Sequence, residues 1–360
     1  MRILHVITSL QTGGAEHLLV DLLPRLRAGG RHNVDLLLFS GERTPFMSEL
    51  ESKGIKIFKL TEGGNVYNPL NILRMIRYVV QYDIIHTHNT ACQLFTPIAR
   101  MMSFTRKPLV TTEHSSNNRR RTKWWCKPID RWMYNRYAAV VCMADKPRRN
   151  LENYIGKKPN ICTIPNGVDT QRFFRPVKDI TGQDKFVITM VAGLRKEKDH
   201  ETVLKAMTHL PDNYSLQLVG GGEKEAALKA LTSQLGLENR VSFLGVRLDV
   251  PDILEQSDIV VLSSHWEGLS LSSIEGMASG RPFIASDVDG LREVVGGVGE
   301  LFPHGDDVDL STIIRRLCEH PEEYRDVATR CQEAAQHYDI SVMVKKYLDL
   351  YSRLYGKRDA

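Results

Sequence analysis

Two glutamates at the end of an apolar run have types and spacing that suit the binding of a polyol. Glu267 and Glu275 lie in SHWEGLSLSSIEGMASG, residues 264–280, and only small and apolar residues separate them. The preceding DIVVLSS, residues 258–264, predicts a buried strand, and residues 271–278 predict a helix. The pattern therefore puts one carboxylate before the helix and the other about one turn into it.

The start of this predicted helix suits a phosphate. Gly268, Ser270, Ser272 and Ser273 let backbone amides and hydroxyls meet an anion there. Glu275 would then reach a sugar hydroxyl such as a ribose diol, and Glu267 would lie over the same crevice. The alternative for Glu275 is a carboxylate that interacts only with the helix dipole.

Other predicted strand-to-helix loops carry residues suited to a diphosphate. Arg195 and Lys198 follow the apolar run KFVITMVAG and offer two cations. Gly221 lies in a run of three glycines, and Gly13 and Gly14 open the loop after the first strand, where backbone can approach a ligand. Each signal is weak alone, because solvated turns use the same residues. None of these loops has the GxGxxG pattern of dinucleotide binding.

Three histidines end two predicted strands of the first half. His86 and His88 lie two positions apart in DIIHTH and share a face, while His114 ends LVTTEH. A metal site is one interpretation. The other is a buried, hydrogen-bonded His86 and a functional His114 at the edge of the crevice.

The elements that must position these residues are short apolar strands alternating with helices. Such strands predict parallel sheets covered on both faces. Ligands in these sheets bind beyond the carboxyl ends of the strands. We predict an α/β protein with two doubly wound domains, residues 1–168 and 186–338, joined by a linker at 169–185. The amphipathic segment 339–360 is expected to form a helix that packs on another element, with the first domain as the candidate.

The predicted strands of the first domain are RILHVIT, VDLLLFS, IKIFKL, DIIHTH, LVTTEH, AAVVCMA and NICTIPN, and those of the second are KFVITMVAG, YSLQLVG, VSFLG, DIVVLSS, RPFIASD and GELF.

Composition narrows the class of protein. The chain of 360 residues is typical of a soluble globular protein, and its six cysteines never occur as CxxC, which argues for buried thiols in a reducing cytosol. Neither a signal peptide nor a bilayer-spanning run is expected.

The positive charge is concentrated in one part of the chain. Residues 106–149 hold twelve Lys or Arg against three acidic residues. Arg119–Arg121 with Trp124 and Trp125, followed by a predicted helix through residue 137, suit an anionic membrane surface. A helix packed on its sheet with a solvated basic face is the alternative. A nucleic-acid site is disfavoured, because no nucleic-acid-binding fold is predicted.

These residues carry a family resemblance. The pattern from Glu267 to Glu275, with IPNGVD, LRKEKDHETVLKAM, LVGGGEKEAAL, VSFLG and TGGAE, resembles glycosyltransferase family 4 over nearly the whole chain. The resemblance implies the GT-B fold, in which two Rossmann-like doubly wound domains face each other across a crevice. It implies a retaining glycosyltransferase that uses a nucleotide diphosphate sugar, with UDP as the expected nucleotide.

The resemblance also implies roles for single residues. Glu275 would hold the ribose, Glu267 the donor sugar, and Arg195 and Lys198 the leaving diphosphate. Backbone at Gly14, Leu271 and Ser272 would approach phosphate, and His114 would face the transferred sugar and the acceptor. No metal cofactor is expected, since cationic side chains and helix N-termini replace it.

The sequence departs from the family pattern in three places. Gly193 and Leu194 stand where the family often has Arg and Leu, so Arg195 is displaced. Leu269–Ser270 replaces the common Phe-Gly, and Gly276 replaces an alanine. We expect these changes to affect donor specificity.

The expected acceptor is a glycan or a lipid-diphosphate-linked sugar in bacterial surface polysaccharide assembly, at the cytoplasmic face of the membrane. Two rival functions remain. A nucleotide-sugar epimerase of the same fold would need no acceptor and no basic aromatic segment. A non-catalytic sugar-nucleotide-binding protein would not need Glu267, Lys198 and Glu275 together.

Overall fold

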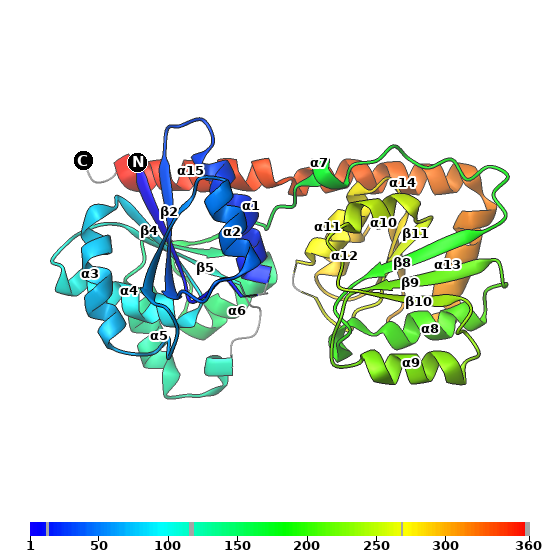
Figure 1. The fold of residues 1–360 in the computed structure, drawn as a ribbon, viewed down its shortest axis with the longest axis horizontal. Helices are drawn as coiled ribbons and strands as arrows, with labels where there is room; N and C mark the ends of the chain where they lie inside the picture. The colour runs from blue at the N-terminus through cyan, green and yellow to red at the C-terminus, as the bar shows by residue number, and fades with distance from the viewer. Residues whose placement is uncertain (12–13, 115–118, 268, 357–360) are drawn as a thin grey trace. The chain divides into compact units, whose positions relative to one another are not determined.

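The chain folds into two compact units. The computed structural model describes residues 1–11, 14–114, 119–267 and 269–356. The first unit consists of Met1–Gly167 with Ile340–Ala360, and the second consists of Val168–Asp339. Each unit is a parallel sheet with helices on both faces, which confirms the predicted α/β class (Figure 1).

The sheet of the first unit has seven strands in the order β3-β2-β1-β4-β5-β6-β7, all parallel. Its strands are β1 (Arg2–Ile7), β2 (Asn33–Ser40), β3 (Lys56–Thr61), β4 (Ile84–His88), β5 (Leu109–Glu113), β6 (Ala139–Cys142) and β7 (Ile161–Thr163). The strand order reverses between β1 and β4. Open parallel sheets bind ligands at such a reversal, just beyond the carboxyl ends of the strands.

Helices cover both faces of this sheet. They are α1 (Gly14–Arg27), α2 (Pro45–Ser52), α3 (Leu70–Gln81), α4 (Thr90–Met102), η1 (Arg119–Thr122), α5 (Cys126–Tyr134), α6 (Asp145–Ile155) and α15 (Ile340–Gly356). One apolar core lies between the sheet and α1, α2 and α15, and the other lies under α3, α4, α5 and α6. The C-terminal helix α15 therefore completes the first unit, where it packs on α1.

The second unit has six parallel strands in the order β10-β9-β8-β11-β12-β13. They are β8 (Phe186–Val191), β9 (Tyr214–Val219), β10 (Val241–Gly245), β11 (Ile259–Leu262), β12 (Phe283–Ser286) and β13 (Glu300–Phe302). Its strand order reverses between β8 and β11.

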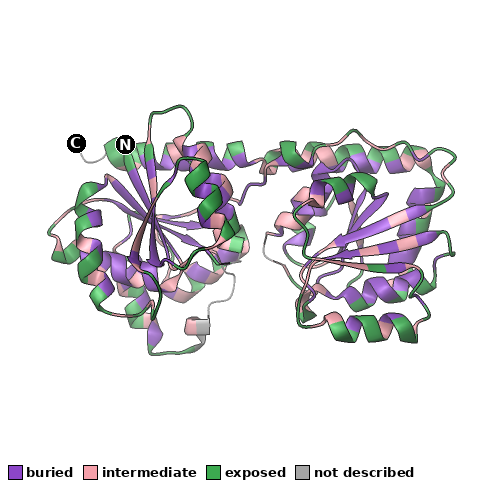
Figure 2. Cartoon of the chain, viewed as in Figure 1, coloured by how far each residue is buried: buried purple, intermediate pink, exposed green. Residues whose placement is uncertain are grey.

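The helices of the second unit are α7 (Thr170–Phe173), η2 (Lys196–Lys198), α8 (His200–Thr208), α9 (Glu225–Gln234), α10 (Val250–Gln256), α11 (Leu271–Ala278), α12 (Leu291–Val295), α13 (Asp307–Glu319), α14 (Pro321–Ala335) and η3 (Gln336–Tyr338). One apolar core holds the unit together, and its strands are largely buried (Figure 2). Helix α7 and the buried Ile180 lie inside the segment that we expected to be a linker.

Every strand among the described residues coincides with one of the apolar runs predicted from the sequence, although β2 begins one residue before its run, at Asn33, and β3 ends one residue after its run, at Thr61. Five of the six cysteines are buried, the sixth is half-buried, and all are free thiols. No helix in the described part of the chain combines the length and apolar character needed to cross a bilayer.

Candidate active site

The predicted residues of the second unit gather where the strand order reverses. Lys198 follows β8, and Glu267 follows the neighbouring β11. Hydrogen bonds tie the two loops together: the His265 amide donates to the Glu197 carbonyl at 2.9 Å, and the Ser263 hydroxyl donates to the Lys198 carbonyl at 3.1 Å. These bonds hold the two predicted catalytic side chains at one edge of the sheet.

Lys198 and Glu267 form an ion pair. Lys198 Nζ lies 2.5 Å from Glu267 Oε1, and the Ser264 hydroxyl donates to the same oxygen at 2.7 Å. The two side chains are 20% and 11% exposed, so solvent screens this pair less than a surface pair. The arrangement presents a cation and a carboxylate together, which suits a ligand that carries both phosphate and hydroxyl groups.

Arg195 lies close to Gly193, the position where the family often has an arginine. Arg195 is exposed, and its Nε lies 3.7 Å from the point where a Cβ on Gly193 would stand. The guanidinium stem therefore runs past the position from which an arginine at residue 193 would start. This geometry keeps a cation beside the loop that follows β8.

Helix α11 begins at the predicted residue. Leu271 and Ser272 are its first two residues, and Glu275 is the fifth, beyond the first turn. Ser270 precedes the helix in extended conformation, and its hydroxyl lies 3.1 Å from that of Ser272. Ser273 is buried and donates to the Ser270 carbonyl at 2.7 Å. The Ser273 hydroxyl is therefore committed to the helix start, which contradicts its predicted contact with phosphate.

The three glycines in the turn after β9 differ in what an added side chain would meet. A Cβ on Gly220 would lie 2.1 Å from the Ala192 carbonyl oxygen, and a Cβ on Gly222 would lie 2.4 Å from that of Leu194. Both glycines therefore allow this turn to pack against the loop after β8. Among the described residues, a Cβ on Gly221 would meet only Val246, at 3.2 Å. Gly221 is therefore the member of the three whose added side chain would meet no backbone atom.

Gly276 has a packing role. A Cβ there would lie 2.6 Å from the Phe283 ring and 2.9 Å from Val260. The absence of a side chain lets α11 lie close to the sheet, which offsets the cost of about 1 kcal/mol for glycine inside a helix. Our expectation that this departure affects donor specificity is corrected: the position faces the core.

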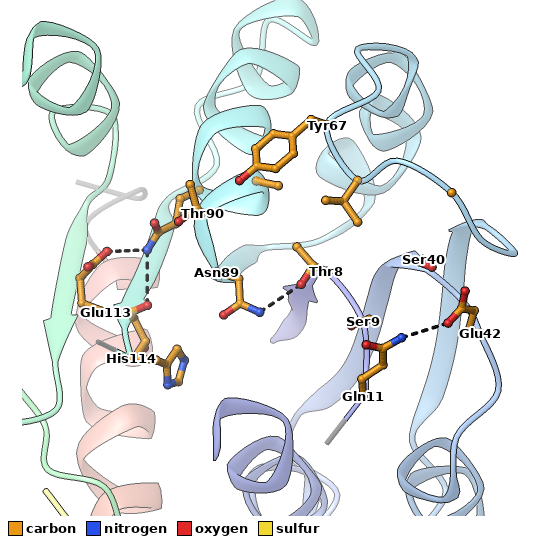
Figure 3. A pocket seen from close by; sticks show the side chains of 15 residues that line it. Thr8, Ser9, Gln11, Ser40, Glu42, Tyr67, Asn89, Thr90, Glu113 and His114 are labelled. Carbon is orange, nitrogen blue, oxygen red and sulfur yellow. Dashed lines mark hydrogen bonds between the residues drawn. The ribbon is translucent and has the colours of Figure 1, made fainter. Parts of the chain in front are cut away.

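The first unit holds a separate polar pocket at its own strand reversal (Figure 3). The pocket has a volume of about 570 Å³. Its lining comes from the loops after β1, β2, β3 and β4 and from the end of β5, and includes Thr8, Ser9, Gln11, Glu42, Tyr67, Asn89, Thr90, Gln93, Glu113 and His114. Most of these lining side chains carry an amide, hydroxyl or carboxylate group. Such groups suit a ligand rich in hydroxyls.

Asn89 stands at the start of α4 with a φ of 66°, which is rare for a residue other than glycine. Its amide donates to Thr8 Oγ1 at 3.1 Å (Figure 3). The same amide lies 3.4 Å from Glu16 Oε1. Strained residues of this kind cluster at functional sites. Sequence reasoning did not single out Asn89, although it directly follows the histidine-bearing strand.

His114 lies in this pocket and ends a chain of hydrogen bonds through the first unit. His114 Nε2 is 2.8 Å from His88 Nδ1, and His88 Nε2 is 3.0 Å from His5 Nδ1. His5 Nε2 lies 3.5 Å from the Tyr351 hydroxyl of α15, which is 2.6 Å from His86 Nδ1. Because each neutral imidazole donates through only one nitrogen, the chain fixes the tautomers of its members together.

Burial keeps these histidines neutral. It lowers the pKa of His5 to about 3 and that of His114 to about 4. Burial also lowers the pKa values of His86 and His88 well below 6.5, and the neighbouring imidazoles lower them further. His86 is therefore the buried, hydrogen-bonded residue that we predicted. The metal interpretation of the strand histidines is disfavoured, because both nitrogens of His86 and His88 already have partners.

Two of the arginines predicted to face a membrane form ion pairs with buried carboxylates. Arg121 binds the buried Glu113 at 2.7 Å, and Glu113 also accepts hydrogen bonds from Tyr134 and Gln93. Arg120 pairs with the buried Asp130 at 3.1 Å. The side chain of Arg119 lies outside the described residues. The side chains of Arg120 and Arg121 are 22% and 12% exposed, and each is paired with a buried carboxylate, so neither offers an unpaired charge to a membrane. Membrane contact by the rest of this segment stays a prediction.

The exposed part of this segment lies further along the chain. Trp124 is 86% exposed and Trp125 is 53% exposed, and Lys123 lies over the ring of Trp125. The exposed face continues on α5 with Ile129 and Arg131, whereas Met133 and Tyr137 are core residues. We define the basic aromatic patch as Lys123, Trp124, Trp125, Lys127, Ile129 and Arg131.

The structure describes one of the two glycines predicted to approach a ligand in the first unit. Gly14 is the first residue of α1, and a Cβ there would meet no described atom within 4 Å. Packing therefore gives no reason for a glycine at this position. Gly13 lies outside the described residues.

The structure thus brings seven predicted residues to the loops and to the start of α11 at one edge of the second sheet: Arg195, Lys198, Gly221, Glu267, Leu271, Ser272 and Glu275. Gly14 and His114 belong to the first unit. Sequence reasoning missed His5 and Tyr351, which contact the predicted histidines. In the sequence, His5 appears only as a polar residue within an apolar strand. Tyr351 appears only as a tyrosine on the apolar side of the last helix.

Comparisons with known proteins agree with this architecture. Residues 172–337 match the family model of glycosyl transferases group 1, and residues 12–172 match that of glycosyltransferase family 4. EpsD of Bacillus subtilis (strain 168), whose name classes it as a glycosyltransferase, is 28% identical over 314 residues, 79% of this chain and 82% of EpsD.

Two further proteins are informative. The Escherichia coli UDP-Gal:alpha-D-GlcNAc-diphosphoundecaprenol alpha-1,3-galactosyltransferase is 29% identical over 229 residues, 58% of this chain and 59% of that protein. The structure of Anabaena Alr3699/HepE in complex with UDP matches with a TM-score of 0.85 and 24% identity, covering 98% of this chain and all of that one.

The two family models meet at residue 172 and together span residues 12–337, with each model on a separate sheet and its switch-point site. The chain therefore belongs to the group 1 glycosyltransferases of the family 4 type, with the GT-B fold.

Proposed function

We propose that this glycosyltransferase is a retaining, metal-independent enzyme that moves a sugar from a UDP-sugar to a hydroxyl of a glycan or lipid-diphosphate-linked acceptor in bacterial surface polysaccharide assembly. The observation that carries the proposal is the Lys198–Glu267 pair beside the N-terminus of α11, at the strand reversal of the second unit. The E. coli relative is named for a UDP-sugar and a diphosphoundecaprenol-linked acceptor. The Anabaena neighbour was solved with UDP.

The donor would bind to the second unit. Glu275 would accept hydrogen bonds from the ribose hydroxyls, one turn inside α11. The amides of Leu271 and Ser272 would meet the diphosphate at the helix N-terminus, where the dipole favours an anion. Gly221 would leave room for the donor, and Glu267 would contact hydroxyls of the transferred sugar.

The leaving group would be stabilised by charge already in place. As the bond from the anomeric carbon to the diphosphate breaks, negative charge grows on the departing oxygen. Lys198 and Arg195 would offset that charge without a metal. Donor binding would also draw Lys198 Nζ toward phosphate and release Glu267 to the sugar, since the two atoms are 2.5 Å apart.

Retention of the anomeric configuration would follow if the acceptor attacked the sugar on the same face from which the leaving group departs. The acceptor hydroxyl would bond to the anomeric carbon through an oxocarbenium-like state, and its proton would pass to the departing phosphate oxygen. Neither glutamate would then act as the nucleophile that retaining hydrolases use.

The acceptor would bind to the polar pocket of the first unit. That pocket offers hydrogen-bonding groups to hydroxyls, and His114 is neutral within it. A neutral imidazole positions a hydroxyl by hydrogen bonding and adds no positive charge near the forming cation. This supports a role for His114 at the acceptor or the transferred sugar.

The basic aromatic patch would contact the cytoplasmic face of the membrane, where a lipid-linked acceptor is found. Exposed tryptophans beside lysine and arginine suit an anionic interface. Replacing Lys123, Lys127 and Arg131 by glutamine should reduce sedimentation with anionic vesicles. Unchanged sedimentation would remove the membrane from the proposal.

The decisive experiment measures nucleotide release by the purified protein from a panel of UDP-, GDP- and ADP-sugars, with EDTA, with and without bacterial lipid extract. Release from a UDP-sugar that rises with the extract supports the proposal, and the anomeric configuration of the product then tests retention. Conversion of the donor without release would indicate an epimerase. Tight binding without conversion would indicate a binding protein.

A further inference from the structure

A second cluster of chemically active side chains lies in the second unit and takes no part in the proposed transfer. Asp199, His265 and His304 come from three loops, after η2, β11 and β13 respectively. One potential ligand atom from each lies within 4.8 Å of the other two. Because all three belong to one unit, the cluster is complete within that unit.

The separations between these atoms are close to those of a metal site. His265 Nδ1 lies 2.5 Å from His304 Nε2 and 3.7 Å from Asp199 Oδ2, and the distance from His304 Nε2 to Asp199 Oδ2 is 3.9 Å. Ligand atoms about 2.0–2.1 Å from a tetrahedral ion are about 3.3 Å apart. The three observed separations each lie within about 1 Å of that value, so only small movements of the side chains are needed to place the atoms around an ion.

The carboxylate is held in position before any ion binds. The Thr202 hydroxyl donates to Asp199 Oδ2 at 2.6 Å, which is the kind of contact that orients a ligating carboxylate. Asp199 is 8% exposed and has a φ of 48°, a left-handed conformation that costs about 1–3 kcal/mol at a residue other than glycine. The surrounding structure therefore keeps this side chain at the cluster despite strain.

The two imidazoles differ in their freedom. The His265 backbone is tied to Glu197 by the hydrogen bond described above, and its ring stacks on Trp266. His304 lies on an exposed loop before Gly305, whose φ is 79°. One ligand is thus anchored and one can adjust, which gives an ion a route of entry from solvent.

The donor set selects a class of ion. Two imidazole nitrogens and one carboxylate suit zinc, cobalt, nickel or ferrous iron, whereas magnesium and calcium prefer oxygen ligands. Three protein ligands leave at least one coordination position open for water or an anionic oxygen. We propose that Asp199, His265 and His304 form a zinc-class divalent metal site that connects the loops after β8, β11 and β13.

The site goes beyond the proposed transfer, which uses no metal, and its test does not depend on activity. Tag-free protein stripped of metal is titrated with Zn²⁺ in competition with a chromophoric chelator, and with Co²⁺ while visible absorption is recorded. We expect one Zn²⁺ per chain and the intense absorption of tetrahedral cobalt. His265→Gln and His304→Gln should each weaken binding by about tenfold or more.

Two further variants sharpen the comparison. Asp199→Asn keeps a side chain that tolerates the left-handed conformation and still accepts from Thr202, but it removes the charge. It should also weaken binding. His209→Gln is the matched control, because His209 pairs with one carboxylate, Asp307 at 2.8 Å, on the surface of the same unit. Its affinity for Zn²⁺ should equal that of the unmodified protein.

Thermal unfolding provides an independent measurement. Zn²⁺ at about 100 times its Kd should raise the Tm of the unmodified protein and of His209→Gln by several degrees, but not that of His304→Gln. Since His304 is on an exposed loop, this variant should fold normally without metal. The proposal is overturned if Zn²⁺ does not bind stoichiometrically at 100 µM, or if His265→Gln and His304→Gln bind it as tightly as the control.

Discussion

The two units place their sites at the same point of the same architecture, but they build them differently. In the second unit, Lys198, Glu267 and the start of α11 form a charged site from loops next to adjacent strands. In the first unit, the pocket that contains His114 is polar, and behind it lies a buried chain of neutral histidines ending at α15. One site depends on charge near the surface and the other on hydrogen bonds in the core.

This difference suits a division of labour in glycosyl transfer. A departing diphosphate needs positive charge where its own charge develops. An acceptor hydroxyl needs direction more than charge, and fixed neutral groups supply direction. Changes of pH should therefore disturb the stability of the first unit most, and removal of charge should disturb the chemistry of the second.

The largest expected effect is the loss of stability of the first unit in acid. The pKa of His5 is lowered to about 3 and that of His114 to about 4, while an unfolded histidine titrates near 6.5. Below pH 6.5 these histidines bind protons in the unfolded chain but stay neutral in the folded unit. The contribution of these histidines to the free energy of unfolding is complete above pH 6.5. It is lost as the pH falls toward 4, by up to about 1.4 kcal/mol per pH unit for each histidine.

Tryptophan fluorescence can report on this unit alone. Three of the four tryptophans lie in the first unit, and the half-exposed Trp266 of the second can be replaced by phenylalanine. Urea unfolding of Trp266→Phe at pH 7, 6 and 5 should show a steep fall in the free energy of unfolding. A flat profile would mean that the buried histidines take up protons while folded.

The next effect in size concerns Lys198. Lys198→Ala removes the cation that pairs with Glu267 and should lower kcat by about 100-fold or more, since charge on the leaving diphosphate is no longer offset. Lys196→Ala is the matched control, an exposed lysine in the same turn. Steady-state rates with a saturating UDP-sugar measure both. Equal rates for the two variants would remove Lys198 from the site.

Glu275 should affect binding more than rate. Glu275→Ala should weaken the binding of UDP itself by about tenfold, because loss of hydrogen bonds to a charged group costs about 1.5 kcal/mol or more. Calorimetric titration with UDP and with the UDP-sugar should give the same loss for both ligands. A loss seen only with the UDP-sugar would assign Glu275 to the sugar instead. Glu319→Ala, an exposed glutamate of α13, provides the control.

The smallest expected effect is that of Gly14→Ala. The structure offers space for the added methyl group, so the Tm should stay the same or rise slightly. If the backbone of this loop approaches the donor, the KM for the donor should rise by a few-fold. An unchanged KM would mean that Gly14 serves only the turn.

Much of the fold and of the second site could be predicted from the chain itself. The described strands match apolar runs, because a strand buried on both faces needs a continuous apolar segment. Lys198 and Glu267 could be found because each lies next to such a strand, and parallel strands bring their carboxyl ends to one edge. The start of α11 could also be predicted, because it too follows shortly after such a strand in the sequence.

Tertiary structure decided the rest. His5, His88 and His114 are separated by 83 and 26 residues, and Tyr351 lies 346 residues from His5, so no local pattern connects them. The same holds for Arg121 and Glu113, where a basic run concealed a buried ion pair, and for Asp199, His265 and His304. A sequence determines which elements form, because the forces on a strand or helix are largely local. Which side chains meet between elements depends on the order of strands and on the helix that covers each face, and only the folded chain sets these.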